Sequence, residues 1–83
     1  LNSKVTVSGH TDNIPVGFSD RFLSNWDLSA ARAAAVADYL LTQNAVTVDR
    51  IDVVGFADTK PMASNSTQEG RSQNRRIELL IDG

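Results

Sequence analysis

Two residues of opposite charge, Asp12 and Arg32, are the strongest candidates for chemistry in this chain of 83 residues. Asp12 lies in Gly9-His10-Thr11-Asp12-Asn13, just past a short alternating pattern, and Arg32 lies in Leu28-Ser29-Ala30-Ala31-Arg32-Ala33, in the first turns of a helical pattern. A carboxylate and a guanidinium at neighbouring element ends can hold the two charges of one amino-acid headgroup. They can also pair with each other, and the residues alone leave both interpretations open.

The surroundings of Arg32 indicate a nearby anion. It lies four residues after Leu28 and four before Val36, so the helical period places it along the expected buried stripe. The helix dipole also disfavours a cation close to a helix N-terminus. The alternative to a bound ligand is an internal salt bridge with Asp12, Asp20 or Asp27. For Asp12, the alternative is an Asx-turn, in which its side chain bonds nearby backbone N–H groups.

Arg75 and Arg76 open the last predicted strand. Ile77, Leu79 and Ile81 form its apolar set, and Arg75 shares their face because side chains alternate along a strand. We therefore expect Arg75 to project toward the helical layer and Arg76 toward the opposite face. A positively charged strand end without further function would show the same two residues.

Other chemistries find less support. The chain has no cysteine, which excludes disulfides and thiolate metal sites. His10 and Asp12 lack an evident third metal ligand, and the Gly-x-Ser-x-Gly motif is missing. The net charge of −2 argues against a generic nucleic-acid or anionic-membrane binder. We expect no catalytic residue, no metal, no cofactor and no nucleic-acid partner.

The periodicity predicts three strands and two helices. The strands are expected around Val5 and Val7, over 48–55 and over 75–81; a loop is expected over 13–26 and another over 56–66. The long helix should run from about Asp27, as N-cap, to Gln43, with Asn44 left-handed beyond it. Its apolar stripe should comprise Leu28, Ala31, Ala35, Val36, Tyr39 and Leu40. Ser66 and Glu69 have capping-box spacing, which predicts a short helix ending near Gly70 or soon after.

The order strand, helix, strand predicts parallel pairing of the first two strands and an α/β fold. Four stretches then resemble the OmpA-like peptidoglycan-binding domain in order and spacing, across essentially the whole chain: Val7–Asn13, Leu28–Ala33, Val53–Asp58 and Asn74–Glu78. Three further stretches resemble the MotB/PomB branch, the periplasmic anchors of flagellar motor stators: Ser24–Ser29, Asp58–Pro61 and Asn65–Arg71.

The resemblance implies a binding site for the peptidoglycan stem peptide. In OmpA-like domains the aspartate of the Thr-Asp motif holds the ammonium of diaminopimelate, and the arginine of the Leu-Ser-x-x-Arg motif holds its carboxylate. The matching residues here are Asp12 and Arg32. The other positions that the resemblance places at the pocket are Thr11, Asn13, Asn25, Leu28, Asn74 and Arg75.

The resemblance also implies helices on one face of a small mixed β-sheet, with the last strand inside the sheet and antiparallel to its neighbours. The family fold has a strand and a helix before the segment equivalent to Val5. We therefore expect residues 1–83 to form one domain that is N-terminally incomplete, without that first strand and helix. A sheet of three strands would leave apolar surface uncovered.

The implied function is non-catalytic attachment of a membrane protein, a stator subunit, to the cell wall. The alternative is the same module in an outer-membrane porin, a lipoprotein or a secretion-system anchor. A peptidoglycan hydrolase is the alternative from another class, but paired carboxylates in a suitable setting are not evident. The domain would lie in the periplasm, reach the membrane only through an upstream segment, and form a homodimer in the full-length protein.

Overall fold

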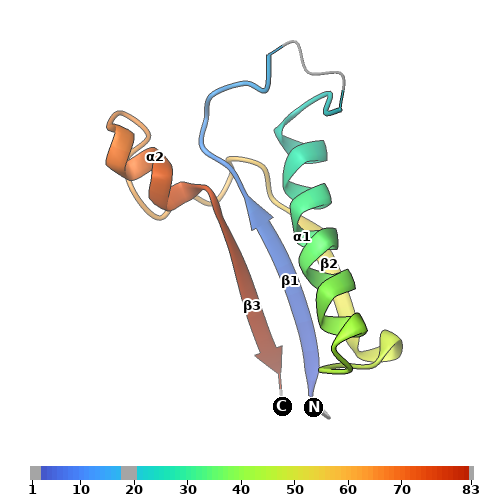
Figure 1. Ribbon diagram of the computed structural model, residues 1–83. Helices are drawn as coiled ribbons and strands as arrows, with labels where there is room; N and C mark the ends of the chain where they lie inside the picture. Colours follow the sequence, from blue (N-terminus) through green and yellow to red (C-terminus); the bar gives the residue numbers. More distant parts are fainter. Residues whose placement is uncertain (1–2, 18–20, 83) are drawn as a thin grey trace.

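The computed structural model describes residues 3–17 and 21–82. Its elements are β1 (Lys4–His10), α1 (Asn25–Thr42), a 3₁₀ turn (Val48–Arg50), β2 (Ile51–Gly55), α2 (Gln68–Asn74) and β3 (Arg76–Asp82). The central strand β1 pairs in parallel with β2 and antiparallel with β3. Helix α1 lies along β1 and β2, whereas α2 lies beside the start of β3 (Figure 1). The expected α/β fold with a mixed sheet is confirmed.

The strand register determines which side chains face α1. Val7 pairs with Val53 on β2 and with Leu79 on β3, so these three side chains share one face of the sheet. The core on this face consists of Val5, Val7, Ala33, Ala37 and Val46. Since α1 covers β1 and β2, Leu79 and Ile81 on β3 stay exposed. Within the described residues β3 is an edge strand, and the family-derived expectation of an inner position is not met there.

Helix α1 begins earlier than the sequence suggested. Ser24 is the N-cap and its hydroxyl oxygen accepts the Asp27 N–H at 3.4 Å. The Asp27 carboxylate in turn accepts the Leu23 N–H at 3.1 Å. The prediction of Asp27 as N-cap is therefore wrong, because Ser24 is the N-cap and Asp27 lies three residues later in the first turn, where its carboxylate bonds the residue before the cap. The helix ends as expected, with Asn44 left-handed at φ 57°.

The face of α1 that contacts the sheet consists of small side chains, Ser29, Ala33 and Ala37. The predicted stripe is wrong in part, because half of its members are exposed: Ala31, Ala35 and Tyr39. The reason is a close approach of the helix backbone to the strands. A methyl group added at Gly9 would lie 2.0 Å from the Ser29 carbonyl oxygen. Only small residues fit at that separation, so the larger apolar side chains occupy the flanks of the helix.

The second half of the chain departs from prediction at three boundaries. Val48–Arg50 forms a 3₁₀ turn, so β2 is shorter than expected. Thr67, not Ser66, caps α2, its hydroxyl oxygen accepting the Gly70 N–H at 3.0 Å, and the helix continues past Gly70 to Asn74. Arg75 is the C-cap of α2, so β3 begins one residue later than predicted.

Candidate functional site

Asp12 lies two residues beyond β1 at the end of the sheet. The preceding Thr11 N–H donates to the Ala57 carbonyl at 2.8 Å, which ties this turn to the segment after β2. The Asp12 carboxylate accepts the Ile14 N–H through Oδ1 at 3.0 Å, the Asx-turn that the residue type favours. The Asn25 side-chain amide donates to the Asp12 carbonyl at 3.4 Å and to the Ile14 carbonyl at 3.1 Å. The start of α1 thus fixes the turn that presents Asp12.

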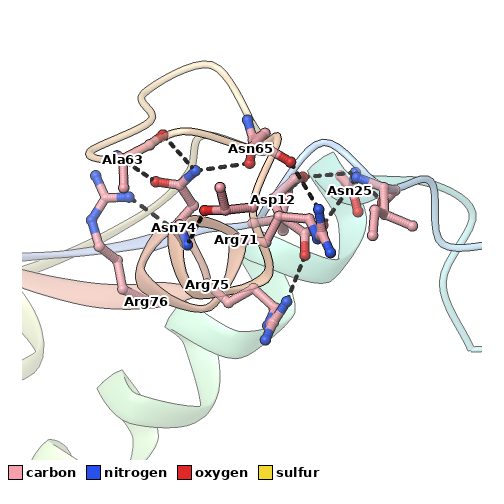
Figure 2. Close-up of polar contacts among 12 residues, drawn as sticks. Asp12, Asn25, Ala63, Asn65, Arg71, Asn74, Arg75 and Arg76 are labelled. Atoms are coloured by element: carbon pink, nitrogen blue, oxygen red, sulfur yellow. Dashed lines mark hydrogen bonds and ion pairs between the residues drawn. The ribbon is translucent and has the colours of Figure 1, made fainter.

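The second carboxylate oxygen of Asp12 pairs with Arg75. The Arg75 guanidinium donates from Nη1 to Oδ2 at 2.7 Å, reaching across from the junction of α2 and β3 (Figure 2). The two side chains differ in burial, with 9% of the Asp12 side chain and 43% of the Arg75 side chain exposed. A buried anion is therefore satisfied by a cation that solvent, or a ligand, can reach.

Arg32 takes neither of the positions that the sequence suggested. It is exposed on α1, so its expected place in the buried stripe is wrong. Within the described residues it forms no ion pair with Asp12 or Asp27, and Asp20 lies outside them. Because Ala30 faces Gly55 of β2, the helical spacing places Arg32 on the other flank of α1, toward β3. There it lines a shallow pocket with Arg21, Phe22, Leu28, Ala31 and Ala35.

Asn74 is fully buried and holds the loop before α2. Its Oδ1 accepts the Met62 and Ala63 N–H groups at 2.8 and 3.0 Å, and its Nδ2 donates to the Ala63 carbonyl at 3.0 Å and the Asn65 Oδ1 at 2.8 Å (Figure 2). These four bonds use the full capacity of an amide side chain. The observed role of Asn74 is to fix the loop and the end of α2, from which Arg75 projects.

Arg76 holds the same loop from the other side of the junction. Its guanidinium donates to the Lys60 carbonyl at 2.8 Å and the Asn74 carbonyl at 3.3 Å, and pairs with Glu78. The structure thus brings Thr11, Asp12, Asn25 and Arg75 together directly. Asn13 is exposed beside them, and Leu28 and Arg32 lie on the flank of α1.

Sequence reasoning missed Ser29, which links α1 to the segment after β2. This buried side chain accepts the Ala57 N–H at 3.0 Å and donates to the Trp26 carbonyl at 3.1 Å. Ala57 has a left-handed backbone with φ 53°, which is uncommon for a residue other than glycine. One signal was available in the sequence. Ser29 lies four residues before Ala33 in an alanine-rich helix, so the two share one face, and that spacing indicates a packed position for the serine.

A second polar cluster lies on the sheet face opposite α1. His10 is buried there and stacks on Phe56 with ring centroids 5.3 Å apart. Its Nε2 lies 3.2 Å from the Ser8 hydroxyl and 3.8 Å from the Glu78 carboxylate. Burial lowers the pKa of His10, and Arg76 lowers it further, against an opposing effect of Glu78. Among the described residues, no group of three or more potential metal ligands occurs.

A model of the OmpA family matches residues 1–75. The chain belongs to the OmpA family. This family is non-catalytic, so the expectation that the domain is no enzyme is confirmed, as is the resemblance from which it came. No helix in the described part of the chain has the length and hydropathy needed to cross a membrane.

The relatives have different parent proteins. Motility protein B of Bacillus subtilis is 44% identical over 77 residues, which cover 93% of this chain and 29% of that protein. Peptidoglycan-binding protein ArfA of Mycobacterium tuberculosis is 43% identical over 81 residues, 98% of this chain and 23% of that protein. The chain thus spans less than a third of the length of either relative.

Two solved structures are similar over nearly the whole chain. The cell wall anchor of the T6SS from Pseudomonas aeruginosa superposes with a TM-score of 0.91 at 41% identity, covering 100% of this chain and 57% of that one. The C-terminal domain of Helicobacter pylori MotB superposes with a TM-score of 0.87 at 30% identity, covering 99% of this chain and 61% of that one.

Proposed function

We propose that this domain binds peptidoglycan non-covalently through the diaminopimelate of the stem peptide. The observation that carries the proposal is the ion pair between the buried Asp12 and the accessible Arg75, with Arg32 exposed on the flank of α1. Diaminopimelate offers an ammonium and a carboxylate on one carbon. The ligand ammonium replaces Arg75 at Asp12, and the released Arg75 together with Arg32 receives the ligand carboxylate.

This exchange is favoured by its charge balance. The Asp12 carboxylate keeps a cationic partner, because a ligand ammonium takes the place of the guanidinium that it displaces. A ligand with only an ammonium would pair with Asp12 and leave Arg75 without an anion. A ligand with only a carboxylate would pair with Arg75 and leave Asp12 without a cation. Arg32 is suited to grip a carboxylate with two parallel hydrogen bonds.

The remaining site residues have supporting roles in this proposal. The Thr11 hydroxyl donates to the Asp12 carbonyl at 2.8 Å, and the Asn25 amide donates to the same carbonyl, so both maintain the turn that presents Asp12. Asn13 lies at the rim, and Leu28 offers apolar contact on the flank of α1. Asn74 acts through the loop that it holds, and so keeps Arg75 in reach of Asp12.

For the parent protein, we propose a flagellar motor stator subunit of the MotB type. The domain would lie in the periplasm, as a homodimer, joined to the membrane through a segment upstream. The likeness to Motility protein B and to the H. pylori MotB domain supports this assignment. A secretion-system anchor is the second candidate, supported by the TM-score of 0.91 to the T6SS cell wall anchor.

A pull-down with purified cell walls tests the binding proposal. Walls that contain diaminopimelate should retain the domain, and walls with lysine at that position should not. Asp12→Asn, which keeps the size of the side chain and removes its charge, should abolish retention. Equal retention by both wall types would overturn the proposal, and release of soluble wall fragments would favour a hydrolase. Restored swimming by a chimaera with the membrane segment of Motility protein B would support the stator assignment.

A further inference from the structure

Trp26 is the only tryptophan of the chain, and it stays outside the core. It lies in the first turn of α1 with 56% of its surface exposed. Its backbone carbonyl is fixed by the Ser29 hydroxyl at 3.1 Å. Tryptophan offers a large apolar face and one polar N–H, and an exposed one on a fixed backbone indicates a contact surface.

Trp26 lines an open groove of about 520 Å³ at the end of the sheet. That volume is within the range of about 300–1,000 Å³ typical of small-ligand sites. Its apolar lining consists of Trp26, Leu23, Val16 and Pro15, and its polar side chains are Asn13, Ser24, Asn25 and Asp58. Among the described residues of this lining, Asp58 is the one that is charged. The groove thus combines an aromatic surface with amide and hydroxyl groups and a single carboxylate.

The groove is continuous with the Asp12 turn. Asn13 follows Asp12 in the chain. The side-chain N–H groups of Asn25 donate to the Asp12 and Ile14 carbonyls. In the described part of the chain, the Asn25 Oδ1 and the Asp58 carboxylate accept no hydrogen bond. These two acceptors lie in the groove lining and are available to a ligand that extends beyond Asp12.

We propose that this groove binds the amino-sugar disaccharide that carries the stem peptide, an inference that rests on the proposed function. A pyranose ring has a C–H face that packs on an indole, and hydroxyl and acetamido groups at its edge. These edge groups match Asn13, Asn25 and Asp58 as hydrogen-bonding partners. A basic ligand would find one carboxylate among the described residues of the lining, and an apolar peptide would cover these polar groups without pairing them.

Three soluble ligands test the proposal by calorimetry and by the emission of Trp26: the stem peptide, the disaccharide, and the two joined as one muropeptide. The muropeptide should bind about tenfold more tightly than the stem peptide. The disaccharide and the muropeptide should shift and quench the tryptophan emission, whereas the stem peptide should leave it nearly unchanged. Since the chain has one tryptophan, the signal reports on this groove alone.

Two variants complete the experiment. Trp26→Ala should remove the advantage of the muropeptide and leave stem-peptide affinity intact, while Trp26→Tyr should keep part of the advantage. Tyr39→Ala is the matched control, because Tyr39 is an aromatic residue on the same helix with 63% exposure. Equal affinity for muropeptide and stem peptide, or an emission shift with the stem peptide alone, would overturn the inference and leave the proposed function standing. Failure of all three ligands to bind would overturn both.

Discussion

Asp12 and Arg75 are separated by 63 positions in the chain and joined by an ion pair with an N–O distance of 2.7 Å. The pair links the turn after β1 to the junction of α2 and β3. Asp12 has a second, neutral partner in the Ile14 N–H. The carboxylate therefore keeps one fixed hydrogen bond when its charged partner changes, which makes the pair suitable for exchange with a ligand.

Replacing Arg75 by alanine should weaken wall binding strongly and stability only modestly. Because the guanidinium is partly exposed, the cost should be about 1 kcal/mol, near the range for exposed pairs and well below the 3–5 kcal/mol of a fully buried one. Urea unfolding measures the cost, and wall pull-down measures binding. A loss of several kcal/mol with wall binding preserved would show that the pair is only structural.

Arg32 offers a cleaner separation of function from stability. Arg32→Ala should change the free energy of unfolding by less than about 0.5 kcal/mol, since the side chain is exposed and unpaired within the described residues. Wall binding should nevertheless fall, and Arg32→Lys should restore it only in part because lysine lacks the planar fork. Lys4→Ala, at the other end of β1, is the matched control and should leave binding unchanged. Unaltered binding by Arg32→Ala would remove Arg32 from the site.

Arg76 should matter mainly for stability. Its side chain is 17% exposed and bonds two backbone carbonyls and Glu78. Arg76→Ala should cost about 1–3 kcal/mol by leaving these groups unpaired. Wall binding by the folded fraction should fall far less than with Arg75→Ala, because Arg76 bonds the loop before α2 whereas Arg75 pairs with Asp12. Equal losses of binding at a temperature where both variants are folded would contradict this ranking.

The parallel pairing of β1 with β2 and the turn at Asp12 were predictable because they follow from local patterns. Alternation identified the faces of β1 and β3, and the position of Asp12 after a strand identified the turn. The face of α1 was not predictable in the same way. Its contact with β1 and β2 depends on Gly9 and Gly55 lying side by side, which is a property of the register and not of the helix sequence.

The ion-pair partner of Asp12 could not be predicted from local sequence patterns either. Charge and spacing suggested Arg32, which comes next along the chain on a neighbouring element. The structure pairs Asp12 with Arg75 instead, because β3 lies beside β1 and α2 ends at the same edge of the sheet. Such a contact follows from the complete topology, to which Asn74 and its four loop bonds also contribute.

The close approach of α1 gives a direct test of the packing. Gly9→Ala should destabilise the domain by more than about 3 kcal/mol, because the new methyl group would lie 2.0 Å from a backbone oxygen that cannot move independently. Gly17→Ala is the matched control. It has no atom within 4 Å of the added methyl but a φ of 73°, so we expect a cost of about 1–2 kcal/mol from backbone strain alone. Thermal and urea unfolding measure both, and similar costs would contradict the close packing.

His10 should make stability depend on pH near neutrality. Burial lowers its folded pKa below the ordinary value of 6.5, so the unfolded chain binds a proton more readily. Its contribution to stability is therefore fully present above that ordinary value, and it is lost as the pH falls toward the folded pKa. The pKa of Glu78 is also lowered, chiefly by its hydrogen bond with Arg76. Its contribution to stability changes only below its ordinary pKa of 4.5, at more acidic pH than that of His10.

His10→Phe isolates this effect, because it keeps a ring against Phe56 and removes the titrating group. Urea unfolding between about pH 5 and pH 8 should show stability falling with acid in the parent protein and a flatter profile in the variant. The charged groups nearest His10 are Arg76 and Glu78, and Lys60 lies over the ring of Phe56, on which His10 stacks. Arg76 and Lys60 keep their charge over this range, so they do not produce the slope. Parallel pH profiles for the two proteins would show that His10 does not titrate there.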